Sequence, residues 1–132
     1  QNKNDNITDG TSNTVFLSEV VKIPSTVGQM DFRGVLHLCE GSLYHHNNTP
    51  NSTSPDWVRF DFLHNETYAP AVAMFTTPLA RNQMLSARSK HSGGVMVALA
   101  DGSVRLVRNT ITLPTWQALA TIAGGEVLGS DF

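Results

Sequence analysis

The sequence predicts an α+β, β-rich fold: an antiparallel sheet with a C-terminal hairpin, followed by a short C-terminal helix. Three observations predict this class. An Asp-Gly pair at 101–102 separates an apolar run from a run that alternates polar and apolar residues. A β-branched apolar run lies near the N-terminus, and a helical pattern with proline in its first turn follows the hairpin. The 132 residues match the commonest size of one domain, so we expect residues 1–132 to form a single globular domain.

The first 56 residues predict two strands and one long loop. Residues 7–14 are polar and typical of a tight loop followed by one helical turn. The β-branched run at residues 15–21 predicts a buried strand, and residues 35–39 predict a second strand. Residues 40–56 contain many Asn, Ser and Pro residues and predict a long irregular loop. Because loops of this length in compact domains are usually functional, we expect an interaction surface here.

The middle of the chain surrounds this loop with aromatic residues. Residues 57–63 alternate and predict a strand, whereas the prolines in residues 69–85 predict a loop with short strand pieces. Trp57, Tyr44 and Tyr68 flank the loop, and such residues form either a platform for carbohydrate or part of the core. We expect Trp57 in the core, because it lies in the alternating run, and both interpretations stay open for the tyrosines.

The strongest local signal is the hairpin of residues 94–108. Gly93 and Gly94 give freedom to the entry loop. Asp101 and Gly102 form the turn, because glycine tolerates a positive φ and aspartate tolerates the left-handed region. The residues after the turn alternate, as a returning strand with one solvated face should.

The residues after the hairpin predict a short helix over 111–122. Thr112 or Leu113 lies at its cap, and Pro114 lies in the first turn, where its missing N–H costs nothing. Glycines at 124–125 end the helix. Four residues share one face at helical spacing: Trp116, Leu119, Ala120 and Ala123.

Composition restricts the class of partner. Charged residues make up 15% of the chain, below the typical value of about 25%, and the net charge is −2. The chain has no basic stripe, so we expect neither nucleic acid nor an anionic membrane surface as a partner. A polar surface built from Asn, Ser and Thr is typical of extracellular or envelope proteins. The single cysteine excludes an internal disulfide.

The sequence has no constellation typical of an enzyme. It contains no Gly-x-Ser-x-Gly elbow and no glycine-rich loop between a strand and a helix, so we expect no catalytic residues. Asp101 is either a turn residue or, with Asp9 or Asp131, a calcium ligand, and we favour the turn. We expect no other cofactor. The soft metal ligands lack tetrahedral spacing and predict no firm metal site: His37, Cys39, His45, His46 and His64.

Three segments resemble one bacterial family. Residues 7–14 (Ile-Thr-Asp-Gly-Thr-Ser-Asn-Thr, which includes Asp9 and Gly10) resemble its first block. His91, nine residues and then Asp101-Gly102 resemble its H-X9-DG signature. The third segment resembles the family's closing block and consists of Trp116-Gln117-Ala118-Leu119 followed by Ala-Gly-Gly-Glu-Val at 123–127. The family is the prepilin-type, pseudopilin-like family of planctomycetes and related bacteria, which has no assigned biochemical activity.

The resemblance covers residues 7–21 and 88–132, so we expect the C-terminal part of a pilin-like head without its N-terminal hydrophobic helix. It implies a structural subunit, the globular part of a type IV pilin-like or type II secretion pseudopilin-like protein. Such a subunit assembles with itself or with other pilin-like subunits into a surface filament or secretion pseudopilus. Its location is the cell surface or the extracellular space, with membrane contact only through the missing helix.

Alternatives to this function remain open. The alternative function is that of an extracellular binding module, which contacts polysaccharide or a partner protein through residues 40–56. His91 is either a ligand or an anchor that ties the hairpin to the Asp9 loop, or a structural histidine that holds a turn, and we favour the structural role. Bacterial surface filaments can carry glycans, so Asn47 and Asn51, each in an Asn-x-Ser/Thr acceptor, are candidate glycosylation sites.

Overall fold

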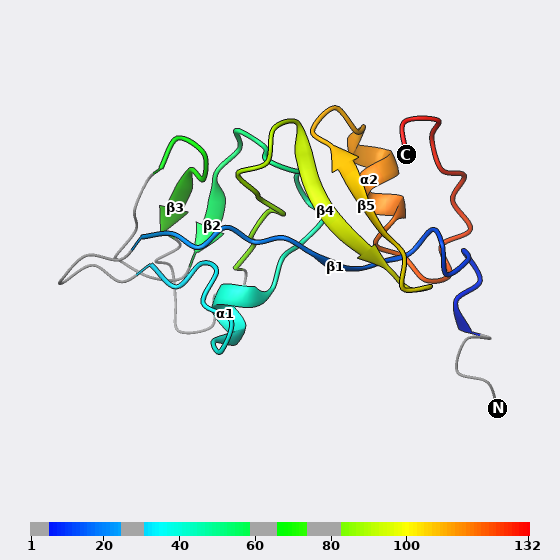
Figure 1. Ribbon diagram of the computed structural model, residues 1–132, viewed down its shortest axis with the longest axis horizontal. Helices are drawn as coiled ribbons and strands as arrows, with labels where there is room; N and C mark the ends of the chain where they lie inside the picture. The colour runs from blue at the N-terminus through cyan, green and yellow to red at the C-terminus, as the bar shows by residue number, and fades with distance from the viewer. Residues whose placement is uncertain (1–5, 25–30, 59–65, 74–82) are drawn as a thin grey trace.

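The computed structural model describes residues 6–24, 31–58, 66–73 and 83–132 (Figure 1). Their elements are β1 (Val15–Ser18), α1 (Cys39–Ser42), β2 (Asp56–Val58), β3 (Ala71–Ala73), β4 (Gly94–Leu99), β5 (Val104–Arg108) and α2 (Leu113–Ala118). Strands β1, β4 and β5 form an antiparallel sheet in the order β1-β4-β5, and β2 pairs with β3 in a small parallel sheet. The predicted α+β, β-rich class is therefore confirmed, whereas the parallel pair was not predicted.

The hairpin lies where the sequence predicts it. Strands β4 and β5 pair from Gly94 with Arg108 to Ala98 with Val104. Gly102 has a φ of 85°, and the Asp101 carboxylate accepts a hydrogen bond of 2.8 Å from the Ser103 N–H. Gly94 tolerates no side chain, because a Cβ there would collide with the carbonyl oxygen of Val107.

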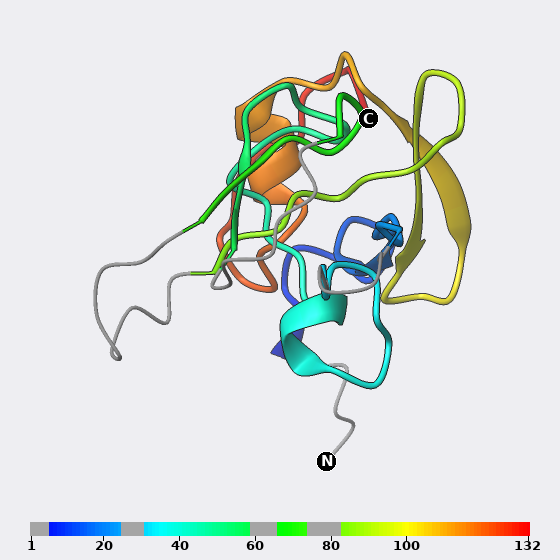
Figure 2. The same cartoon turned by 90° about the vertical axis from the view of Figure 1, so that its left-hand side faces the viewer.

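The main core lies between the three-stranded sheet and α2, which packs against one side of β4 and β5 (Figure 2). Period-two alternation places every second residue of β4 on this side. Trp116 and Leu119 fill the centre, and both are 0% exposed. The buried residues of this core are Ala87, Val95, Val97, Leu99, Val107, Ile111, Trp116 and Leu119.

Helix α2 is shorter than the predicted span of 111–122. The predicted cap at Thr112 and the first-turn proline are confirmed. After Ala118 the chain turns more tightly, with i to i−3 hydrogen bonds from Ala120 and Thr121. Ala120 and Ala123 are exposed whereas Trp116 and Leu119 are buried, so the prediction that the four residues share one face is wrong.

The opposite side of the sheet is apolar and open. Register places Leu17 beside Ala98 and Val104, and places Met96 beside Leu106. We call these five residues the outer sheet face. The predicted burial of strand 15–21 is wrong: Leu17 is 58% exposed and Phe16 is 72% exposed. A register shift between Val15 and Leu17 interrupts the alternation of inward and outward side chains along β1. Val15 packs against the main core, whereas Leu17 lies on the outer sheet face.

Two further predictions are wrong. The predicted strand 35–39 is instead a set of turns that ends at the start of α1 at Cys39, because the Val35 and Leu38 N–H groups donate to carbonyls three residues earlier. Trp57 is 38% exposed, whereas its neighbours Asp56 and Val58 are buried. The inward positions of β2 are therefore occupied by a charged and an aliphatic residue, which turns Trp57 outward.

The other predictions for the middle of the chain, residues 40–85, are confirmed only in part. Strand β2 covers only the start of the predicted strand 57–63, and β3 is one of the short strand pieces expected within 69–85. Residues 59–63 and 74–82 lie outside the described residues. The predicted loop 40–56 is irregular except for the end of α1 and the first residue of β2.

The three segments that carry the family resemblance meet at one end of the molecule. The carbonyls of Thr11 and Thr14 accept hydrogen bonds of 3.0 Å and 2.9 Å from the Asp101 and Ala100 N–H groups of the hairpin turn. The Asp9 carboxylate accepts hydrogen bonds of 2.8 Å from the N–H groups of both Gly124 and Gly125. The N-terminal block therefore links the hairpin turn to the segment after α2.

We expect Gly102→Val to lower the free energy of unfolding by more than about 1 kcal/mol, because a β-branched residue is strained at positive φ. A Cβ at this position meets nothing within 4 Å, so the loss reports the backbone alone. Urea unfolding measures it, with Gly102→Asn as a control that tolerates the left-handed region and loses less. Unchanged stability in the valine variant would show that the turn is wrongly placed.

Candidate functional site

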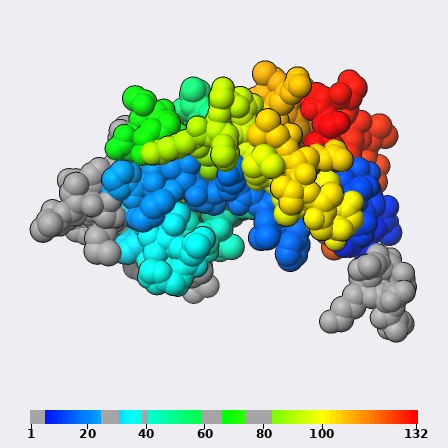
Figure 3. Space-filling view, viewed as in Figure 1, coloured from blue at the N-terminus to red at the C-terminus, as the bar shows by residue number. Residues whose placement is uncertain are grey.

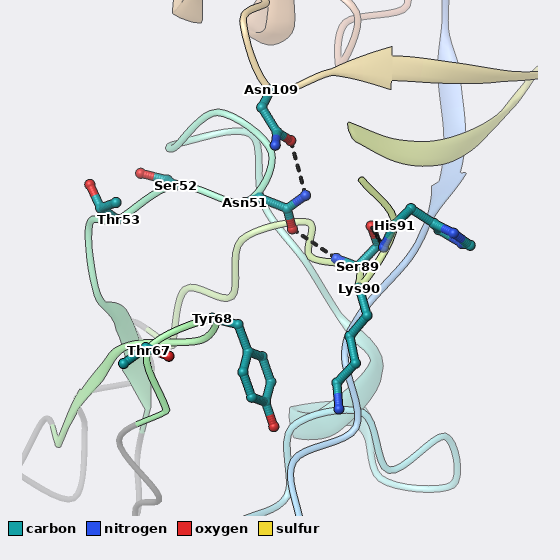
Figure 4. Close-up of a pocket in the computed structure, with 9 residues that line it drawn as sticks. All are labelled: Asn51, Ser52, Thr53, Thr67, Tyr68, Ser89, Lys90, His91 and Asn109. Carbon is teal, nitrogen blue, oxygen red and sulfur yellow. Dashed lines mark hydrogen bonds between the residues drawn. The ribbon is translucent and has the colours of Figure 1, made fainter. Parts of the chain in front are cut away.

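A surface hollow of about 500 Å³ lies where the segments that precede β2, β3 and β4 meet the residue after β5 (Figure 4). We call it the Asn51 hollow. Its lining consists of Asn51, Ser52, Thr53, Thr67, Tyr68, Ser89, Lys90, His91 and Asn109. Part of the predicted interaction loop, residues 51–53, therefore forms one wall.

Asn51 organises the centre of the hollow. It is the only non-glycine residue with positive φ within the described part of the chain, with a φ of 52°. Its Oδ1 accepts a hydrogen bond of 2.8 Å from the Ser89 N–H, and its Nδ2 donates to the Asn109 Oδ1 at 2.9 Å (Figure 4). Asparagine tolerates this conformation better than most residues, so one side chain joins the loop, the entry to β4 and the end of β5.

Tyr68 and Lys90 form another wall. The Lys90 Nζ lies 4.7 Å from the centroid of the Tyr68 ring, and the two side chains run in the same direction in Figure 4. Tyr68 packs against a small core of Val21, Ile23 and Ala69, which fixes its position. An aromatic face beside amide and hydroxyl groups suits a polar, uncharged or anionic ligand.

A buried group of four charges lies beneath these walls. The Arg88 guanidinium binds both oxygens of Asp56, at 2.9 Å from Nε to Oδ2 and 3.0 Å from Nη2 to Oδ1. The Nη1 of Arg33 donates to the Asp56 Oδ2 at 3.3 Å, and the Nη2 of Arg33 donates to the Asp31 Oδ2 at 2.7 Å. All four side chains are only 2–3% exposed. Among the described residues, the two cations and two anions of this group balance in charge.

The same side chains hold main-chain carbonyls around the hollow. Arg88 donates to Ser52 O at 2.6 Å and to Ser54 O at 3.0 Å, and Arg33 donates to Ala69 O at 2.8 Å. Sequence reasoning missed this network. Arg88 begins the segment that carries the H-X9-DG resemblance, but the partners of its side chain lie 20 or more residues away along the chain, where no local pattern points to them.

The candidate carboxylates are used for hydrogen bonds within the chain. Hydrogen bonds from the Gly125 and Gly124 N–H groups hold the pKa of Asp9 below its usual value. The hydroxyl and N–H of Ser103 lower the pKa of Asp101. The Thr112 N–H and the Thr115 hydroxyl lower the pKa of Asp131. The three aspartates therefore serve separate turns and one helix start.

Among the described residues, His91 forms hydrogen bonds with Ser89 and Glu19 and none with the Asp9 loop, so the less favoured alternative, an anchor to that loop, has no support. Its Nε2 lies 3.0 Å from the Glu19 Oε1, and the imidazole is 60% exposed. The other Glu19 oxygen accepts a hydrogen bond of 2.8 Å from the Met96 N–H. The histidine therefore pairs with a carboxylate that joins the segment after β1 to β4.

The structure brings the soft metal ligands to different places. Within the described residues, no three His, Cys, Asp or Glu side chains lie close enough to hold a metal ion together. His37 and Cys39 do not share a strand face, because this segment is a turn followed by α1. His64 lies outside the described residues. In the described ranges, neither helix has the length and hydropathy needed to span a bilayer.

His46 packs against the buried tryptophan of α2. The imidazole stacks on Trp116 with ring centroids 3.7 Å apart, and its Nδ1 lies 2.5 Å from the Trp116 carbonyl oxygen. Burial lowers the pKa of His46, and the His45 charge adds to this effect, whereas the bond to the carbonyl opposes it. Tyr44 lies beside His46, and burial raises its pKa to about 12. Tyr44 is therefore a packing residue next to the main core.

The two candidate glycosylation sites differ. Asn47 is exposed, and its Nδ2 contacts the Met84 sulfur. The Asn51 Nδ2 is engaged with Asn109 and with the Gly94 carbonyl. A glycan on Asn51 would break these hydrogen bonds, so Asn47 is the more accessible of the pair.

We expect the stability of the protein to fall as the pH decreases below 6.5. The folded pKa of His46 is lower than its unfolded value near 6.5, so the unfolded state binds the proton more tightly. The stabilisation is complete above pH 6.5 and is lost as the pH decreases toward the lowered pKa. Melting temperatures between pH 7.5 and 5 measure the effect. His46→Phe keeps an aromatic ring and should flatten the profile; an equal slope in this variant would contradict the assignment.

Comparison with known proteins gives one match. The family described as "Protein of unknown function (DUF1559)" matches residues 2–113, which include the hollow, the buried charges and the whole hairpin. No curated protein and no solved structure matches the chain. Because the match extends over most of the sequence, this chain belongs to the DUF1559 family.

Proposed function

We propose that this chain is a structural subunit, the globular part of a type IV pilin-like or type II secretion pseudopilin-like protein that assembles into a surface filament or secretion pseudopilus. The observation that carries the proposal is the outer sheet face. Its members Leu17, Val104 and Leu106 are 58%, 63% and 47% exposed and lie on neighbouring strands. Contiguous exposed apolar residues mark surfaces that another molecule covers.

The use of the resembling motifs also supports a structural role. Asp9 joins the N-terminal block to Gly124 and Gly125, Asp101 closes the hairpin turn, and Trp116 is the centre of the main core. These groups hold the fold together, as expected of a rigid head that is displayed on an assembly.

Assembly through this face would be heterologous. A surface that meets a different patch on the next subunit generates a helical filament rather than a closed ring. The partners are then further copies of this chain or other pilin-like subunits, and the location is the cell surface or the extracellular space.

Charge placed on the outer sheet face should prevent assembly. We expect Leu17→Asp and Val104→Asp to abolish filaments of the full-length protein in electron micrographs, because each buries an unpaired carboxylate at the contact. Val127→Asp is the matched control: Val127 is 95% exposed in the C-terminal tail, and this variant should assemble normally. Urea unfolding confirms that all three variants are folded.

Two results would contradict the proposal. Filaments that form equally well with aspartate on the outer sheet face would show that this face is not the contact. A full-length protein that stays strictly monomeric in lipid would contradict assembly itself.

A binding module is the second candidate, and the Asn51 hollow favours it. The hollow combines the Tyr68 ring, the Lys90 ammonium and several amide and hydroxyl groups, which suits a polysaccharide or a polar segment of a partner protein. Under this function, monomers bind glycan, and Tyr68→Ala removes the binding whereas Tyr44→Ala, which changes a packing residue away from the hollow, retains it.

A further inference from the structure

Strand β5 forms an open edge of the three-stranded sheet. The strand order β1-β4-β5 gives β5 one neighbour, and no described strand pairs with its other side. Edge strands expose backbone donors and acceptors that an extended chain can pair with. Such an edge is therefore a candidate docking site.

The register identifies the free backbone groups. Asn109 N–H donates to Gly93 O, and Leu99 N–H donates to Ser103 O, so these pairs belong to the hydrogen-bonded set. Hydrogen-bonded and non-hydrogen-bonded pairs alternate along an antiparallel ladder. Val104 and Leu106, which pair with Ala98 and Met96, therefore direct their N–H and C=O groups away from β4.

A groove accompanies this edge. It has a volume of about 350 Å³ and lies between Arg105–Arg108 of β5 and residues 130–132 of the C-terminal tail. Figure 3 shows the hairpin surface directly beside this tail. The groove gives an added chain a second wall besides the strand itself.

The charges of the groove favour an anionic occupant. Arg105 stacks on Phe132, with its guanidinium carbon 4.7 Å from the ring centroid, and Arg108 is exposed. Among the described residues, neither arginine forms a salt bridge. Asp131 lies in the groove, but its carboxylate is held by the Thr112 N–H and the Thr115 hydroxyl. Two arginines therefore remain available to an acidic partner.

We propose that the open edge of β5 binds an extended acidic segment of a partner protein by strand addition. The main chain of that segment pairs with Val104 and Leu106, and its side chains alternate between the two sides of the sheet. Acidic side chains on the side of Val107 meet Arg105, and apolar side chains extend the outer sheet face, where Arg108 lies at the end of the strand. This contact and the proposed filament contact share Val104 and Leu106 but use different groups: strand addition uses their main-chain N–H and C=O groups, whereas the filament contact uses their side chains.

The probe is an acetylated, amidated hexapeptide of alternating valine and aspartate. We expect calorimetric binding that weakens with salt, together with slower hydrogen exchange at the Val104 and Leu106 amides. Arg105→Glu combined with Arg108→Glu should weaken binding at least about tenfold. A peptide with lysine in place of aspartate is the matched ligand control and should not bind.

A proline substitution tests the backbone contact. Leu106→Pro deletes an N–H that faces away from β4, so the ladder keeps its bonds while the docking donor is lost. Leu106→Ala removes the same side chain and keeps the donor. We expect the alanine variant to bind and the proline variant to fail. Peptide binding unchanged by the glutamate pair, exchange protection outside β5, or sedimentation showing a second copy on this edge would each overturn the proposal.

Discussion

The position of Asp56 between two guanidinium groups is the constraint on which the middle of this molecule depends. A buried carboxylate is costly unless it is paired and hydrogen-bonded. Here Arg88 binds both oxygens, Arg33 adds a third contact, and the Ser86 N–H donates at 2.9 Å. Satisfying one charged side chain therefore fixes the start of β2, the segment before α1 and the segment before β4 relative to one another.

This network also explains why a hollow exists above it. Arg88 donates hydrogen bonds to the carbonyls of Ser52 and Ser54, and the Asn51 side chain accepts one from the Ser89 N–H. These bonds fix the wall of the hollow that residues 51–53 form. Among the described residues, the apolar clusters near β2 and β3 contain three buried residues each. Charged and amide groups therefore add to the order of this part of the described structure.

The hairpin was predictable because its signals are local, and the network was not because its partners are distant. An Asp-Gly turn, alternation and a first-turn proline lie within a few residues of the structures that they form. By contrast, the Asp56 carboxylate meets residues 23 and 32 positions away. Strand β2 shows the consequence. The local sequence Asp-Trp-Val predicts that Trp57 points inward, whereas the distant arginines stabilise the inward position of Asp56 and so place Trp57 outward. Asp9 was singled out from sequence, but its target amides lie 115 and 116 residues away.

Removal of one partner of the network tests the central claim most directly. Arg88→Met keeps an apolar stem of similar reach and leaves the Asp56 charge without its bidentate partner. Urea unfolding should show a loss of about 3–5 kcal/mol, because an uncompensated charge stays buried. Lys90→Met, two residues along and exposed, loses only the contact with the Tyr68 ring and should change the free energy of unfolding by less than about 1 kcal/mol. An Arg88→Met variant as stable as Lys90→Met would contradict the account.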